Sequence, residues 1–392
     1  MSEWRECKLL EIIELIGGGT PKTTISEYWN GEIPWLSVVD FNNGKKYVFD
    51  TEKKITQLGL ENSSTKLLNT GDIIISARGT VGVIAVLAKE MTFNQSCYGV
   101  RGIAEKSITD FIYYLLKDTV SDLKQISHGG VFDTITRDTF NEIDISLPPF
   151  PEQKAIAAVL SCLDDKIDLL HRQNKTLEAM AETLFKQWFV VEAQEDWEEV
   201  TLEDITTRIT DGAHLSPSTV ENGFPMASVK DMHQWGINIE SCRKISESDF
   251  NELVRNDCRP LKNDIIIAKD GSYLKHVFVA ENDLDVVILS SIAILRPNEK
   301  YHPLLLATFL KMPSTREDLE NIVTGAVIPR IVLKDFRKFT IILPPKDVQE
   351  KALNIIEPIY LKCWRNVAQI QTLETLRDNL LPKLMSGEVR VT

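Results

Sequence analysis

The sequence predicts an α+β protein in which two similar globules alternate with two long helices. Three observations predict this architecture: an apolar heptad pattern over residues 152–191, a second over residues 347–385, and motifs that recur in the same order before and after the first helix. At 392 residues the chain is long enough for two or three domains. We therefore expect an internal pseudo-two-fold repeat of globule and helix.

The first heptad pattern begins just after Leu147-Pro148-Pro149, because consecutive prolines end both strands and helices. Apolar residues then recur at alternating spacings of four and three, which is typical of a helix that packs along another helix. The seam consists of Ile156, Leu160, Leu163, Ile167, Leu170, Asn174, Leu177, Ala181, Leu184 and Trp188. At about 1.5 Å per residue the helix would be roughly 60 Å long, which suits a spacer.

The second heptad pattern is less regular, and Pro358 is predicted to kink its helix. Its seam consists of Ala352, Ile356, Ile359, Cys363, Asn366, Ile370, Leu373, Arg377, Leu380 and Leu384. An antiparallel register that sets Ile156 opposite Leu384 also sets Asn174 opposite Asn366. The two amides either bond to each other in the seam or lie at its edges and bond water.

The repeat divides the chain into four segments, predicted as residues 1–150, 151–191, 192–345 and 346–392. Within the first globule the strand candidates are residues 33–39, 72–76, 81–87 and 143–147, and residues 109–125 have helical spacing. The repeated strings are Trp4-Arg5-Glu6 and Trp197-Glu198-Glu199, Ser37-Val38-Val39-Asp40 and Ser228-Val229-Lys230-Asp231, Gly71-Asp72-Ile73-Ile74-Ile75 and Asn263-Asp264-Ile265-Ile266-Ile267, and Leu147-Pro148-Pro149 and Leu343-Pro344-Pro345.

Composition excludes several classes of protein. The net charge is −13, so the chain carries no general basic surface for nucleic acid, and such binding would need local clusters or partners that supply cations. No apolar run approaches the length of a membrane span. The six cysteines are scattered, which predicts reduced thiols in a cytoplasmic protein.

The motifs expected of an enzyme are incomplete. Leu147-Pro148-Pro149-Phe150 resembles the Asn-Pro-Pro-Phe loop of adenine methyltransferases, but leucine cannot bond the target amino group. Residues 17–22, Gly-Gly-Gly-Thr-Pro-Lys, lack the spacing of a phosphate-binding loop. Glu152-Gln153-Lys154 resembles part of a nuclease site but opens a helix, and the six histidines form no metal-spaced pair. We expect no catalysis, no cofactor and no metal site.

Two pairs of loops at matching positions are the candidates for binding. Ala77-Arg78-Gly79-Thr80 and Lys269-Asp270-Gly271-Ser272 each follow an apolar strand and place a basic residue and a hydroxyl beside a glycine. Such turns can approach phosphates or base edges, although a single one would be an ordinary solvated hairpin. Residues 128–132 and 324–328 form the second pair, in which the glycines can also serve backbone geometry alone.

Taken together, these strings resemble the DNA-specificity (S) subunits of type I restriction–modification systems over essentially the whole chain. The resemblance rests on the two half-repeats, the Leu-Pro-Pro junctions followed by Glu152-Gln153-Lys154 and Gln349-Glu350-Lys351, and residues 184–190 and 381–388. It implies that each globule is a target-recognition domain and that the helices form an antiparallel coiled coil. Asn263, where the first half has Gly71, departs from the family pattern.

The resemblance also implies the function. Each globule would read one half of a split, asymmetric target in double-stranded DNA, and the helices would set the spacer and dock two methyltransferase subunits. Motor-nuclease subunits would then join the complex, and these partners would carry adenine-N6 methylation and ATP-driven cleavage. The predicted DNA contacts are Ser37, Asp40, Arg78, Gly79, Thr80, Gly129, Gly130, Ser228, Lys230, Lys269, Gly271, Ser272, Gly325 and Arg330.

Two other interpretations remain open from the residues alone. The chain could be a scaffold that binds proteins, with two modules on a coiled-coil stalk, or an enzyme without a recognised motif. A gel-shift assay with the methyltransferase subunit would distinguish the DNA-binding interpretation from the scaffold.

Overall fold

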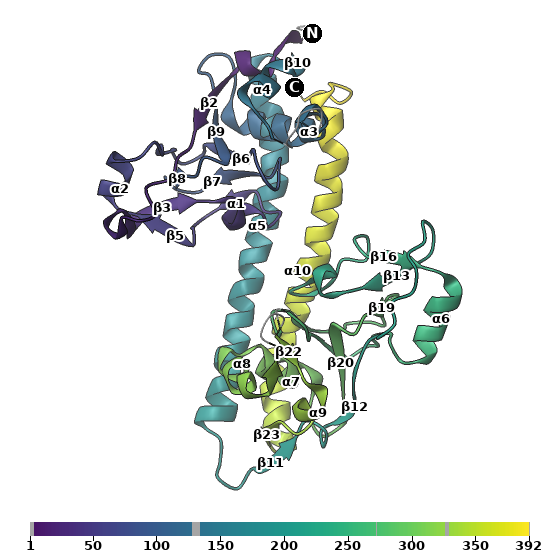
Figure 1. Cartoon of the computed structure of the whole chain (residues 1–392). Coiled ribbons are helices and arrows are strands. Elements are labelled where there is room, and N and C mark those ends of the chain that lie inside the picture. The colour runs from purple at the N-terminus through teal and green to yellow at the C-terminus, as the bar shows by residue number, and fades with distance from the viewer. Residues whose placement is uncertain (1–3, 128–133, 272, 326–328, 392) are drawn as a thin grey trace. The chain divides into compact units, whose positions relative to one another are not determined.

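The computed structural model describes residues 4–127, 134–271, 273–325 and 329–391 (Figure 1). The chain forms two compact units: unit 1 comprises Met1–His171 and Gln369–Thr392, and unit 2 comprises Arg172–Ala368. Each unit contains one globule and part of both long helices. Each compact unit therefore combines a globule with segments of both long helices. The sequence had suggested four consecutive segments instead.

The described residues of unit 1 form three sheets, with strand orders β2-β9-β6-β7-β4, β5-β3-β8 and β1-β10. Its strands are β1 (Arg5–Lys8), β2 (Ile13–Gly17), β3 (Trp29–Leu36), β4 (Tyr47–Val48), β5 (Lys53–Ile55), β6 (Ile73–Ser76), β7 (Ile84–Leu87), β8 (Thr92–Phe93), β9 (Cys97–Gly102) and β10 (Asp144–Leu147). Besides its parts of the two long helices, its α-helices are α1 (Val38–Phe41), α2 (Gln57–Glu61), α3 (Thr109–Ser127) and α4 (Arg137–Glu142).

Unit 2 contains sheets with strand orders β12-β20-β17-β18, β16-β13-β19, β11-β23, β14-β15 and β21-β22. Its strands are β11 (Glu198–Thr201), β12 (Thr206–Asp211), β13 (Phe224–Ala227), β14 (Met232–His233), β15 (Gly236–Ile237), β16 (Arg243–Ile245), β17 (Ile265–Ala268), β18 (Val277–Val279), β19 (Val287–Ile288), β20 (Ile292–Pro297), β21 (Val323–Thr324), β22 (Arg330–Ile331) and β23 (Thr340–Leu343). Its helices are η4 (Val229–Asp231), α6 (Glu247–Arg255), α7 (Pro303–Lys311), α8 (Pro313–Leu319) and α9 (Leu333–Phe336).

The predicted repeat is present in the strand topology. The order β2-β9-β6-β7 in unit 1 corresponds to β12-β20-β17-β18 in unit 2, and β5-β3-β8 corresponds to β16-β13-β19. In both three-stranded sheets one neighbour of the central strand is antiparallel and the other is parallel. The sequence repeat therefore encodes the same arrangement of strands twice.

Most predicted elements lie where the apolar patterns placed them, with two corrections. The strand expected over residues 33–39 is β3, which ends at Leu36, and Val38 and Val39 belong to α1. The apolar run predicted too long a strand because Ser37 is a helix N-cap. Its backbone N and its Oγ each donate to Asp40 Oδ2 at 2.8 Å. The strand expected from residue 81 begins three residues later, at Ile84.

Asn263 preserves the turn in which the first half has a glycine. Gly71 has φ +88° and Asn263 has φ +69°, so both adopt the left-handed conformation, which asparagine tolerates better than most residues. The backbone N of Gly71 donates to Leu87 O, and that of Asn263 donates to Ala280 O, each at 2.8 Å. The departure from the family pattern therefore leaves the turn geometry unchanged.

The two long helices are α5 (Phe150–Lys186) and α10 (Lys346–Met385), drawn in teal and yellow in Figure 1. A π-helical turn (η3, Gln187–Val191) completes the first helix, and α10 is helical on both sides of Pro358. All positions of both predicted seams are buried or half-buried. Residues 4–127, 134–271, 273–325 and 329–391 include no helix long and apolar enough to cross a membrane.

Each globule shares its core with the helix segments of its own unit. In unit 1 the core that contains Ile73 and Phe111 extends to Ile156, Leu160 and Leu384. In unit 2 the corresponding core includes Ala181, Phe185, Ala352, Ile356 and the strand residue Ile265. The antiparallel seam is thus continuous with the globular cores.

A buried glutamine joins each long helix to its globule. Gln153 Nε2 donates to Lys106 O at 3.1 Å and Pro148 O at 3.0 Å, and its Oε1 accepts from Ile108 N at 3.1 Å. Gln349 makes the same three kinds of bond, to Lys300 O, Pro344 O and His302 N. The Glu-Gln-Lys and Gln-Glu-Lys strings are therefore structural junctions.

Replacing either glutamine by leucine is expected to destabilise the protein by about 2–4 kcal/mol. The substitution keeps the side-chain volume but leaves two carbonyls and one backbone N–H buried without their partner. Urea unfolding of Gln153→Leu and Gln349→Leu measures the loss, with the exposed neighbour Glu350→Leu as control. Equal stability of all three variants would contradict the junction role.

The two seam asparagines are in contact within unit 2. Asn366 Nδ2 donates to Asn174 Oδ1 at 2.7 Å, and Asn174 Nδ2 donates to Cys363 O at 3.2 Å. Both side chains are buried, at 4% exposure for Asn174 and 0% for Asn366. The expected amide–amide bond is therefore present, and the edge alternative does not apply.

We expect Asn174→Leu alone to lower stability by about 1–3 kcal/mol, because it leaves the amide of Asn366 buried without its acceptor. Replacing both residues by leucine removes the polar pair, so the double variant should regain or exceed wild-type stability and show mixed registers or assemblies. A double-mutant cycle by denaturation, with light scattering for assembly, tests both points. Additive effects of the two single variants would refute the coupling.

Candidate nucleic-acid interface

Loops from separate parts of the sequence form a connected edge in unit 1, which we call rim 1: residues 19–20, 77–80, 94–96 and 134. The backbone N of Gly19 donates to Phe93 O at 3.0 Å, and the side chains of Thr20 and Gln95 are hydrogen-bonded. The backbone N of Ala77 donates to Ser96 O at 2.8 Å. Rim 1 thus contains the predicted loop 77–80 together with residues 19–20 and 94–96, which were not predicted as binding loops. The other predicted loop of this half, residues 128–132, lies outside the described residues.

Rim 2 is the matching edge of unit 2 and consists of residues 211–214, 269–271, 289–291 and 329–330. The backbone N of Ala213 donates to Ile288 O at 2.9 Å, as that of Gly19 does to Phe93 O in rim 1. The backbone N of Lys269 donates to Ser291 O at 2.9 Å. The two rims therefore share one backbone framework.

In both units the first predicted loop contacts the segment that follows the second predicted loop. Arg78 pairs with Thr134 across an isolated antiparallel bridge, and Asp270 pairs with Arg330 in the same way. The backbone N of Gly271 also donates to Pro329 O at 2.7 Å. Sequence spacing suggested each loop separately, but only the fold brings the first loop to the residues that follow the second.

The predicted hairpin glycines have equivalent geometry, since Gly79 and Gly271 both have φ +75°. An ideal Cβ at either position would meet nothing within 4 Å, so the left-handed backbone, and not lack of space, favours glycine. Gly325 is also left-handed, with φ +100°. Gly129, Gly130 and Ser272 lie outside the described residues.

The basic residues of the rims differ in accessibility. Arg78 and Arg330 are exposed, as are Gly79 and Thr80. Lys269 is only 7% exposed, and its Nζ lies 3.3 Å from Asp211 Oδ2 and 3.1 Å from Asp270 Oδ1. Lys269 is therefore placed to hold the hairpin against β12, while Arg78 and Arg330 are free to face a ligand.

Ser37, Asp40, Ser228 and the neighbouring Asp231 shape the backbone. Ser228 donates to Asp231 Oδ2 from its backbone N at 2.8 Å and from its Oγ at 2.9 Å, which repeats the bonds between Ser37 and Asp40. These carboxylates accept bonds from the protein itself. Lys230, between the two, is exposed.

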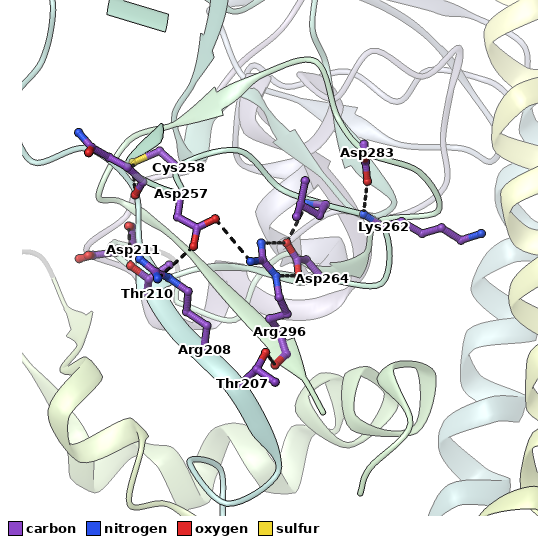
Figure 2. A network of polar contacts seen from close by, with 12 residues as sticks. Thr207, Arg208, Thr210, Asp211, Asp257, Cys258, Lys262, Asp264, Asp283 and Arg296 are labelled. Carbon is purple, nitrogen blue, oxygen red and sulfur yellow. Dashed lines mark hydrogen bonds and ion pairs between the residues drawn. The ribbon is translucent and has the colours of Figure 1, made fainter. Parts of the chain in front are cut away.

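A buried ion pair supports the sheet in each unit, and sequence reasoning missed its basic partner. Arg296 Nε lies 2.8 Å from Asp264 Oδ1 and its Nη2 lies 2.9 Å from Oδ2, a bidentate pair in which Asp264 is fully buried (Figure 2). Arg101 forms the same pair with Asp72. The hydrogen bond to Asp264 raises the pKa of Arg296. The signal that could have indicated these pairs is an arginine near the end of each strand, Arg101 in β9 and Arg296 in β20.

Sequence reasoning also missed two polar pairs on the rims. Thr20 and Gln95 pair on rim 1, and His214 Nε2 lies 3.2 Å from Asp211 Oδ1 on rim 2, with the histidine side chain 76% exposed. Residues 17–22 were tested only as a phosphate loop. Alignment of Gly19-Thr20 with Ala213-His214 in the repeat could have indicated Thr20 and His214 as matching positions, but not their partners. Within the described ranges no group of three or more His, Cys, Asp or Glu could hold a metal ion.

Comparison with known proteins is consistent with this arrangement of two matched units. A family model described as the type I restriction modification DNA specificity domain matches residues 1–179 and 194–374. The chain is 33% identical to the type I restriction enzyme MjaIX specificity subunit of Methanocaldococcus jannaschii, across 99% of this chain and 94% of that protein. It is 22% identical to the EcoKI specificity subunit of Escherichia coli K12, across 98% and 89%.

The fold is also that of a solved specificity subunit. The crystal structure of the S subunit of a type I restriction–modification system from M. genitalium superposes with a TM-score of 0.56 at 17% identity, covering 97% of this chain and 96% of that chain. The family match covers both halves of the chain, and both halves have the same sheet topology and the same rim. The chain therefore belongs to the family of type I restriction–modification DNA specificity subunits.

Proposed function

We propose that the chain is the non-catalytic specificity subunit of a type I restriction–modification complex and that each unit recognises one half of a bipartite DNA target. The observation that carries this proposal is the family match to both halves of the chain. The globules, residues 1–150 and 192–345, serve as target-recognition domains, and the long helices within residues 151–191 and 346–392 set the spacer.

The rims are the surfaces that we assign to DNA. Each carries an exposed arginine, Arg78 or Arg330, beside a left-handed glycine that lets the backbone approach a groove. Different side chains occupy matching positions, such as Thr20 and His214, so the two half-sites should differ and the target should be asymmetric. Gly129, Gly130 and Ser272 remain predicted contacts.

The partners supply what this chain lacks. With a net charge of −13, the chain alone offers little counterion release to DNA, so two methyltransferase subunits docked on the helices would provide most phosphate contacts. Adenine-N6 methylation and, with motor-nuclease subunits, ATP-driven cleavage belong to those partners. DNA binding should therefore be strong only in the assembled complex.

The test is DNA binding by the full chain assembled with its methyltransferase subunits, on a target identified by methylation-aware sequencing of host DNA. We expect Arg78→Ala and Arg330→Ala each to weaken binding by about tenfold, at the half-site of its own unit. Arg255→Ala, an exposed arginine on α6 that belongs to neither rim, is the control. Unchanged affinity in both rim variants would refute the assignment, and absence of any methylated motif would refute the function.

A further inference from the structure

The short helices that follow Ser37 and Ser228 present chemically different side chains at matching positions. Val39, on α1, is 79% exposed, and among the large apolar side chains of the described residues only Leu215 is more exposed. Lys230, on η4, occupies the equivalent position and is also exposed. Hydrophobic burial therefore does not explain a valine in this position.

Both side chains stand on rigid turns. Asp40 accepts bonds from Ser37 and, through Oδ1, from the backbone N of Glu52 at 2.8 Å. Asp231 accepts bonds from Ser228 and, through Oδ1, from Ser241 Oγ at 3.2 Å. Each carboxylate thus fixes the first residue of its turn and ties the turn to a second segment of the chain. A side chain on such a turn has a defined direction, which favours recognition over nonspecific contact.

Both turns adjoin the rims. In unit 1 the backbone N of Asn94, a rim residue, donates to Leu36 O at 3.0 Å, immediately before Ser37. In unit 2 the backbone N of Val229 lies 3.4 Å from Ser291 Oγ, and Ser291 belongs to rim 2. Val39 and Lys230 therefore border the surfaces assigned to DNA.

The two chemistries match different base edges in the major groove. An aliphatic side chain fits the C5-methyl group of thymine, and an ammonium can donate to O6 and N7 of guanine. We propose that Val39 and Lys230 are specificity-determining residues: Val39 contacts a thymine methyl in the half-site of unit 1, and Lys230 donates to a guanine in the half-site of unit 2. This inference rests on the proposed function.

The test for Val39 uses the full chain assembled with its methyltransferase subunits and its mapped target. Each thymine of half-site 1 is replaced in turn by deoxyuridine, which lacks only the methyl group. Wild-type complex should lose about fourfold in affinity at one thymine, the effect of one methyl contact. Val39→Ala should lose this sensitivity at that thymine alone. Leu58→Ala, a similar truncation of an exposed apolar side chain on α2, should keep it.

The test for Lys230 replaces each guanine of half-site 2 by 7-deazaguanine, which lacks N7, or by 2-aminopurine, which lacks O6. Wild-type complex should lose about tenfold at one guanine, and Lys230→Met should be insensitive there. Thermal unfolding of each variant should match wild type, because both side chains are exposed.

The outcomes separate the inference from the function on which it rests. If the wild-type complex has no methylated target, the proposed function fails. If the target exists but Val39→Ala retains every deoxyuridine effect, or half-site 1 contains no thymine, the assignment of Val39 is overturned. A Lys230→Met variant that weakens all probes equally would identify a phosphate contact and overturn the assignment of Lys230.

Discussion

Inserting one heptad into both long helices is expected to lengthen the spacer of the DNA target by about three base pairs and to leave both half-sites unchanged. Seven residues add roughly 10 Å of helix at about 1.5 Å per residue, and DNA rises about 3.4 Å per base pair. Methylation-aware sequencing of cells that carry the variant would show the new spacer. An unaltered spacer would refute the role of the helices as a ruler.

The positions of the insertions follow from the division into units. One lies between His171 and Arg172 in α5, and the other between Ala368 and Gln369 in α10. These are the boundaries between the two units along the sequence. Insertion there leaves the contacts within each unit in place, and a whole heptad keeps the apolar seam facing its partner.

A control insertion into α5 alone separates length from disruption. It moves one seam past the other by a heptad. The pairing of Asn174 with Asn366 in unit 2 and the packing of Leu160 and Leu384 in the unit 1 core therefore cannot both persist. We expect this variant to lose stability and methylation. If it methylates a longer-spaced target normally, helix pairing does not set the spacer.

Asp264→Ala should be among the most destabilising single substitutions in unit 2, by about 3 kcal/mol. It leaves the half-buried guanidinium of Arg296 without its bidentate partner and removes the acceptor for the backbone N of Leu261, which lies 2.7 Å from Oδ2 (Figure 2). Urea unfolding of the full chain measures the loss. Asp72→Ala should have a similar effect through Arg101.

Arg208→Ala is the matched control for this prediction. Arg208 lies near the same network and pairs with Asp257 at 3.0 Å, but its side chain is 46% exposed (Figure 2). Such an exposed pair contributes at most about 1 kcal/mol. Equal losses for Asp264→Ala and Arg208→Ala would show that burial of the carboxylate does not determine the effect.

Much of the fold could be predicted because it depends on periodic patterns. The heptad spacing located both helices to within a few residues and set Asn174 opposite Asn366. The repeated Leu-Pro-Pro and Ile-Ile-Ile strings predicted two globules of one topology. The pattern failed at Ser37. The apolar run predicted a strand over residues 33–39, but Ser37 caps a helix, so the strand ends at Leu36.

The candidate site was less predictable, because it depends on neighbours distant in sequence. Lys269 and Arg78 occupy matching positions beside a glycine in the sequence. In the structure Lys269 is buried and pairs with Asp211, whereas Arg78 is exposed. Nothing local indicated that Arg296 would pair with Asp264, which lies on another strand. The side chains of Thr20 and Gln95 meet only through the sheet.

By itself the sequence determined the family, the duplicated architecture and the antiparallel register, because each follows from spacing along one chain. Only the tertiary structure decided which loops form the rims, which basic residues stay exposed, and that Ser37 and Asp40 support the turn that presents Val39. The physical reason is that burial and pairing depend on packing between strands, whereas periodicity is a property of each helix or strand alone.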